Sequence, residues 1–162
     1  MACAIASNNL PAIRALLKSG REVEEGIKYD DKKTWGTPLM FAAFLGHLGA
    51  VRVLIEAGAD INKHAAFLGS AYENSALWMA CDQNRPDVVM QLIKAGADVN
   101  AVADGSRVSA LVAAVVGGHE ACVALLINAG AYVSERTFMH NILAQYPCTT
   151  NILKMLEDAR SR

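Results

Sequence analysis

The most regular feature of the chain is an apolar stripe with helical spacing that returns four times. In each copy one apolar residue is followed, three and four positions later, by two more, which is one face of an α-helix. The copies are Ile13, Leu16 and Leu17; Val51, Leu54 and Ile55; Val89, Leu92 and Ile93; and Val123, Leu126 and Ile127. We interpret this stripe as the core.

Another apolar helix precedes each stripe, and the clearest one, "TPLMFAAFLGH" at residues 37–47, is apolar on more than one side. The pattern predicts an all-α stack of about five helix pairs without a central β-sheet. The helices are expected at residues 2–7, 11–18, 38–45, 49–57, 76–83, 87–95, 110–116, 120–128, 138–145 and 150–159.

An internal repeat is marked by glycine at positions 20, 58, 96 and 130. The last three glycines each stand 21 residues after a polar residue that opens an apolar helix, namely Thr37, Ser75 or Ser109. The connections from a glycine to the next opener vary instead, with 17, 17 and 13 residues. Constant segments joined by variable loops are typical of stacked repeats, because insertions are tolerated only outside the packing.

The expected helix at residues 38–45 has clear start and stop signals. Thr37 offers an N-cap oxygen, and Pro38 stands at the first helical position, where its missing N–H does no harm. Gly46 ends the helix, and the other units carry Asn8, Asn84 and Gly118 at its position. Glycine and asparagine best tolerate a left-handed backbone, so the repeat predicts that conformation between the two helices of each unit.

The segment "GTPLMFAAFLGHLGAVRVLIEAGADIN" resembles a near-consensus ankyrin repeat, with TPL, AA, GH and GADIN in their family places. The resemblance covers residues 37–134, fits residues 3–20 as a first unit and fades in a last, degenerate helix pair. It implies an ankyrin-repeat solenoid of helix-turn-helix units joined by hairpin-like finger loops. We expect a single domain with units at about residues 1–36, 37–74, 75–108 and 109–136 and a C-terminal cap at 137–162.

Two departures from the family pattern stand out. Met1 aligns with Leu39, so the first unit lacks its opening turn, and we expect the chain to be cut from a longer protein. The fingers "REVEEGIKYDDKKTWG" and "INKHAAFLGSAYEN" are about five residues longer than the usual period of about 33 residues leaves room for.

The resemblance implies a concave groove lined by the first helices of the units and by the fingers. The two residues before each GH turn face this groove in the family, and Phe41, Met79 and Ala113 are expected near the same surface. We interpret the groove as the binding site for a protein or peptide, because aromatic residues and Met are enriched in such interfaces. The expected contacts are Tyr29, Trp35, Phe41, Phe44, Leu45, Phe67, Leu68, Tyr72, Met79, Asp82, Gln83 and Val116, with Gly117 beside Val116.

Other interpretations of these residues remain open. The long fingers can fold back over Phe41 or Phe44, and Trp35 and Trp78 suit packing between neighbouring units. Asp82 and Gln83 suit a solvated helix face.

Asn62 and Asn100 lie in segments, "LIEAGADIN" and "LIKAGADVN", similar to the target of the asparaginyl hydroxylase that acts on ankyrin repeats. The resemblance therefore implies possible hydroxylation at Asn62 and Asn100. The alternative is a structural role, in which each asparagine stabilises the first turn of its finger.

Composition and charge narrow the class of partner. The chain has 162 residues, 53% of them hydrophobic, and a net charge of -1, so no overall field attracts nucleic acid or an anionic membrane. No apolar run approaches the roughly 18 residues of a membrane span, and we expect no membrane insertion. Widely spaced cysteines and the lack of an N-glycosylation sequon favour a cytoplasmic or nuclear location, and we expect a monomer.

Signals for catalysis, metals or cofactors are weak. His47 and His119 fill the GH turn, where a histidine bridges helices in this family, and His64 and His140 have no second ligand at metal spacing. "GHEACVAL" begins like a zinc motif but has Val123 in place of the second histidine. We expect no metal, no cofactor and no enzyme, and favour a protein-binding scaffold. The alternative is a regulatory or autoinhibitory domain of a larger enzyme or channel.

Overall fold

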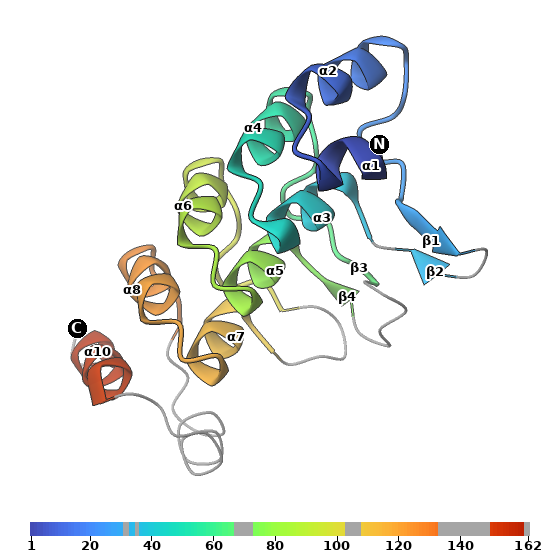
Figure 1. The fold of residues 1–162 in the computed structure, drawn as a ribbon. Helices are drawn as coiled ribbons and strands as arrows, with labels where there is room; N and C mark the ends of the chain where they lie inside the picture. Colours follow the sequence, from blue (N-terminus) through green and yellow to red (C-terminus); the bar gives the residue numbers. More distant parts are fainter. Residues whose placement is uncertain (31–32, 35, 67–72, 103–107, 133–149, 161–162) are drawn as a thin grey trace.

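The computed structural model describes residues 1–30, 33–34, 36–66, 73–102, 108–132 and 150–160. For residues 28–30 and 33–34 it describes the backbone alone. The described helices form two rows (Figure 1). The inner row holds α1 (Ala2–Ala6), α3 (Pro38–Leu45), α5 (Ala76–Asp82) and α7 (Ala110–Val116). The outer row holds α2 (Leu10–Lys18), α4 (Leu48–Glu56), α6 (Pro86–Lys94), α8 (Glu120–Asn128) and α10 (Thr150–Arg160).

Each described helix lies within one residue of its predicted bounds. The predicted helix at residues 138–145 lies outside the described residues. The all-α fold of stacked helix pairs is confirmed, while the division into numbered units stays a prediction.

The inner helices begin at side-chain caps. The side-chain oxygens of Thr37, Ser75 and Ser109 accept hydrogen bonds from backbone N–H groups three residues later, at 3.2, 3.2 and 3.4 Å. Such caps satisfy donors that the first turn of a helix leaves without a partner. The openers recognised in the sequence are therefore N-caps in the structure.

The turn between the two helices of a pair is left-handed, as predicted. Its φ angle is +49° at Asn8, +79° at Gly46, +51° at Asn84 and +70° at Gly118. Only glycine and a few polar residues adopt this conformation at low cost, which explains why these positions vary between Gly and Asn alone.

The fingers carry the little sheet that the described residues contain. β1 (Lys28–Asp30) pairs antiparallel with β2 (Lys33–Thr34), with an irregularity in register between Lys28 and Asp30. β3 (Ala65–Ala66) pairs with β4 (Glu73–Asn74), Ala65 opposite Asn74 and Ala66 opposite Glu73. Both hairpins project from the end of the stack where α3 and α5 begin (Figure 1).

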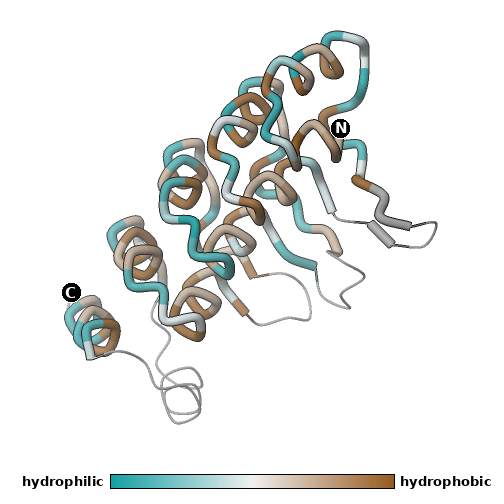
Figure 2. The backbone as a smooth tube through the Cα atoms, in the orientation of Figure 1, coloured by the Kyte–Doolittle hydropathy of each residue, from teal (hydrophilic) through white to brown (hydrophobic). Residues whose placement is uncertain are grey.

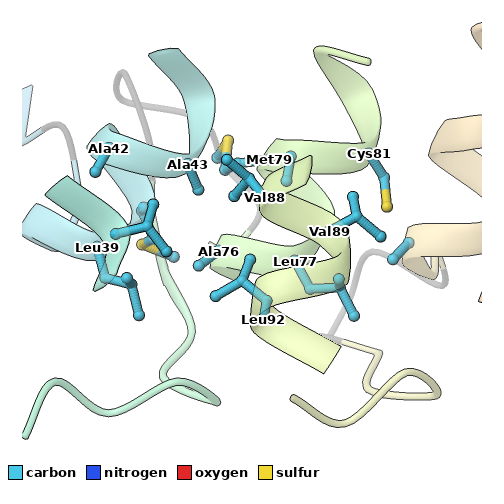
Figure 3. Packing of buried hydrophobic residues seen from close by; sticks show 14 of the residues in the cluster. Leu39, Ala42, Ala43, Ala76, Leu77, Met79, Cys81, Val88, Val89 and Leu92 are labelled. Atoms are coloured by element: carbon cyan, nitrogen blue, oxygen red, sulfur yellow. The ribbon is translucent and has the colours of Figure 1, made fainter. Parts of the chain in front are cut away.

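One continuous core runs through the stack between the two rows. Each inner helix packs against the next inner helix and against its own outer helix. Hydrophobic positions gather on the helices, whereas the turns between the rows are hydrophilic (Figure 2). In the middle of the stack, side chains of α3, α5 and α6 fill the space between the helices (Figure 3). At the C-terminal end, the fully buried Ile152 and Leu156 of α10 cover α8.

Candidate functional site

The last residues of three successive inner helices form a row along the stack. We call these six positions the end row: Phe44 and Leu45 on α3, Asp82 and Gln83 at the end of α5, and Val116 and Gly117 at the end of α7. α3 packs on α5 and α5 on α7, so the three pairs are neighbours in space. The row is fixed by the repeat, because its members precede each left-handed turn.

The apolar members of the end row are half-buried. Phe44 and Leu45 pack on the core at their inner edge and keep part of their surface accessible. Val116 is half-buried as well, and Gly117 is exposed. Two apolar surfaces therefore flank the polar pair of α5, one contributed by α3 and the other by α7.

Three residues expected near this surface are buried instead. Phe41 is 9% exposed, Met79 2% and Ala113 6%. Phe41 and Met79 lie on α3 and α5, which have an inner helix on both flanks, whereas Ala113 lies on α7, which packs against α5 and α8. These side chains belong to the core of the free chain, and a contact between Phe41 or Met79 and a partner stays a prediction.

The finger residues of the predicted site are described only in small part. Tyr29 lies in β1. Trp35, Phe67, Leu68 and Tyr72 lie outside the described residues. Trp78, the other tryptophan, is half-buried and packs on the core.

Residues of the left-handed turns bond to the end of the inner helix in the preceding unit. Nε2 of His119 donates to the carbonyl oxygen of Asp82 over 3.1 Å, and Nε2 of His47 donates to that of Ala6 over 3.2 Å. A carbonyl oxygen can only accept, so Nε2 carries the proton in both histidines. The helix-bridging role expected for these histidines is confirmed.

Arg85 takes the place of histidine in the turn between α5 and α6. Its Nε donates to the carbonyl oxygen of Phe44 over 3.5 Å, and its side chain lies over Gly46, where a Cβ atom would collide with it. Sequence reasoning missed this role. The signal was the position of Arg85, which stands as far after His47 as Asp82 stands after Phe44.

The fingers are linked by a second series of bonds made by asparagine side chains. Asn62 accepts from the N–H of Asp98 over 2.8 Å and donates to the carbonyl oxygen of Gly96 over 3.3 Å. Asn100 bridges to the next unit in the same manner, at 2.7 Å to the N–H of Tyr132 and 3.2 Å to the carbonyl oxygen of Gly130. Both asparagines thus have a structural role between fingers, and their hydroxylation stays a prediction.

Glu24 occupies the equivalent position in the first finger. Its Oε1 accepts from the N–H of Asp60 over 2.9 Å, and its Oε2 lies 3.2 Å from Nζ of Lys63. A carboxylate accepts as asparagine does but cannot donate, so Glu24 has no counterpart of the donor bond to the glycine carbonyl, and its second oxygen pairs with Lys63. The signal in the sequence was again the position in the repeat, because Glu24 stands as far before Asn62 as Asn62 stands before Asn100.

Two buried cysteines carry side chains that could in principle react. Cys81 and Cys122 are both fully buried free thiols, and Sγ of Cys122 lies 3.8 Å from Oδ1 of Asn84. The hydrogen bond with Cys122, and then burial, raise the pKa of the Cys81 thiol well above its ordinary value. A neutral buried thiol is a poor nucleophile, which favours a packing role.

The described residues contain no group of three or more His, Cys, Asp or Glu side chains placed to hold a metal ion. A hollow of about 560 Å³ lies along residues 19–22 and 25, and one of about 130 Å³ lies between α8 and α10. Neither hollow touches the end row. None of the described helices combines the length and the apolar character needed to cross a bilayer.

The comparison with known families agrees with the repeat. The model of the family described as ankyrin repeats, in three copies, matches residues 1–65 and residues 64–137. No curated protein gives a significant match to the chain.

Proposed function

Because the chain belongs to the ankyrin repeat family, we propose that it binds a protein or peptide partner through the end row and the fingers. Ankyrin repeats are generally non-catalytic modules for protein–protein interaction. The observation that supports this particular surface is the half-burial of Phe44, Leu45 and Val116 at the ends of neighbouring helices. Apolar side chains that are neither fully packed nor scattered are suited to a partner's contact surface.

The surface of the outer helices is a weaker candidate for the partner-binding site. The outer helices are linked across the units by polar pairs, such as Arg14 with Glu56 at 3.0 Å and Arg52 with Gln91 at 3.2 Å. On the outer helix α6, the apolar side chain of Met90 is 39% exposed. An isolated exposed residue of this kind is common on any protein surface and needs no partner.

We also propose a monomer in a cytoplasmic or nuclear location. Cys3, Cys81 and Cys122 are free thiols, which suits a reducing compartment.

The test is affinity capture from the native cell with three versions of the chain: wild type, Phe44→Glu and Met90→Glu. Partners of the end row should be captured by wild type and by Met90→Glu but not by Phe44→Glu, because a charge would enter a desolvated contact. Circular dichroism must show that all three remain folded. Capture that is equal for Phe44→Glu and wild type would argue against this surface.

A further inference from the structure

Asp82 carries the single ionisable side chain of the end row, and the residue is half-buried. Oδ2 of Asp82 accepts a hydrogen bond of 2.7 Å from Nε2 of its neighbour Gln83. This bond leaves the second carboxylate oxygen without a protein donor among the described residues. A carboxylate accepts through both oxygens, so its capacity is only partly used.

No cation of the described chain pairs with Asp82. The ion pairs recorded there join Arg14 to Glu56, Arg21 to Glu25 and Lys63 to Glu24. Arg85, the arginine closest in sequence, is directed to the preceding unit by its bond to the carbonyl oxygen of Phe44. Asp82 is therefore a half-buried negative charge without a counter-charge among the described residues, an arrangement that a cation from outside would stabilise.

Apolar surface lies on both sides of this charge. Phe44 and Leu45 stand one unit before it, and Val116 stands one unit after it. A partner that covers the whole row must place an apolar group over α3, a cationic group at α5 and an apolar group over α7. The order of these contacts follows from the order of the helices in the stack (Figure 1).

We propose that the occupant of the end row is a peptide segment with a lysine or arginine flanked on both sides by apolar residues, the cation pairing with Asp82. This proposal rests on the proposed function. Packed helices lie about 8–10 Å apart, and an extended chain advances about 3.3 Å per residue. In an extended occupant the apolar residues stand about three positions before and after the cation.

The probe is a phage-displayed library of random linear peptides, selected on the wild-type chain. Selected sequences should be enriched in a lysine or arginine with apolar residues at the stated spacing. A synthetic peptide of the selected sequence should bind Asp82→Asn about tenfold more weakly than wild type. Asparagine keeps the size of the side chain and its acceptor for Gln83, so the fold should not change. Asp87→Asn, on the exposed face of α6, is the matched control and should bind as wild type does.

A second peptide, with norleucine in place of the lysine or arginine, measures the contribution of the pair between this cation and Asp82. It should bind wild type and Asp82→Asn equally, which completes a double-mutant cycle. Selected peptides that lack a cation, or that bind Asp82→Asn as tightly as wild type, would overturn the pairing.

The outcomes for Phe44→Glu separate this inference from the proposed function. If peptide binding is lost with Phe44→Glu but not with Asp82→Asn, the end row remains the proposed binding surface, and only the pairing of a cation with Asp82 is refuted. Peptides that are indifferent to both substitutions, or a selection that yields none, count against the surface and the cation together.

Discussion

Nε2 of His119 reaches the carbonyl oxygen of Asp82, 3.1 Å away and 37 residues back in the sequence. The bond ties the turn between α7 and α8 to the end of α5. It therefore contributes to the stacking of one unit on the next, and at the same time it holds the residue that we propose as the anchor of a partner's cation.

Removal of this bond should destabilise the stack. We expect His119→Ala to lower the free energy of unfolding by about 1 kcal/mol, because the Asp82 carbonyl loses its donor. Urea unfolding followed by circular dichroism measures this. His64→Ala is the control, since His64 is also half-buried but makes no hydrogen bond with the described residues. Equal stability of the two variants would contradict a stacking role for His119.

Asn62 should contribute to stability through both the oxygen and the nitrogen of its side-chain amide. We expect Asn62→Ala to lower the free energy of unfolding by about 1–2 kcal/mol, since it removes the bonds to Asp98 and Gly96. Asn62→Asp keeps the acceptor and loses the donor, so its effect in urea unfolding should be smaller. An aspartate variant as unstable as the alanine variant would show that the donor bond to Gly96 dominates.

Leu54 and Phe44 should separate folding from binding. Leu54 is fully buried in α4, and Leu54→Ala should cost about 2–5 kcal/mol through the cavity that it leaves. Phe44 is half-buried, so Phe44→Glu should lower the melting temperature much less while it abolishes binding at the end row. Thermal melts of the two variants measure the difference. Equal losses of stability would mean that Phe44 is part of the core.

The thiols should differ in reactivity with iodoacetamide. The thiolate is the reactive form, and the raised pKa of Cys81 leaves less thiolate at any given pH. Exposed Cys3 should therefore be alkylated readily near pH 8, while buried Cys81 should be alkylated only after denaturant is added. Peptide mass mapping before and after unfolding measures both. Rapid labelling of Cys81 in the native chain would contradict its tight packing.

Hydroxylation is tested separately by the intact mass of the protein from its native cell. Modification of Asn62 or Asn100 would add one oxygen at each site, and peptide mapping would locate it. A mass without added oxygen would leave the two asparagines with their structural role alone.

The fold could be predicted because local and repeated signals agree. Thr37, Ser75 and Ser109 cap helices in the structure, and Asn8 and Asn84 take the left-handed turn that their alignment with Gly46 required. These features depend on a few neighbouring residues, which the sequence displays directly.

The site was harder to predict because a second apolar face has two explanations. Helices α3 and α5 each bury one face on their outer helix and two flanks on inner helices. Phe41 and Met79 are therefore buried by packing within the stack. Periodicity does not separate a flank that meets a neighbouring unit from a face that meets a partner. Arg85 and Glu24 were missed for a related reason, since each performs the task of a different residue type in the equivalent position.

Gly117 limits how such a surface can diversify. A Cβ atom at this position would run into the imidazole of His119, so any other side chain here would displace the ring that holds Asp82. A lineage that adapts this chain to new partners can thus gain a side-chain contact at 117 only by moving the ring of His119, so at the end of α7 a change in recognition is coupled to a change in the stacking of the units.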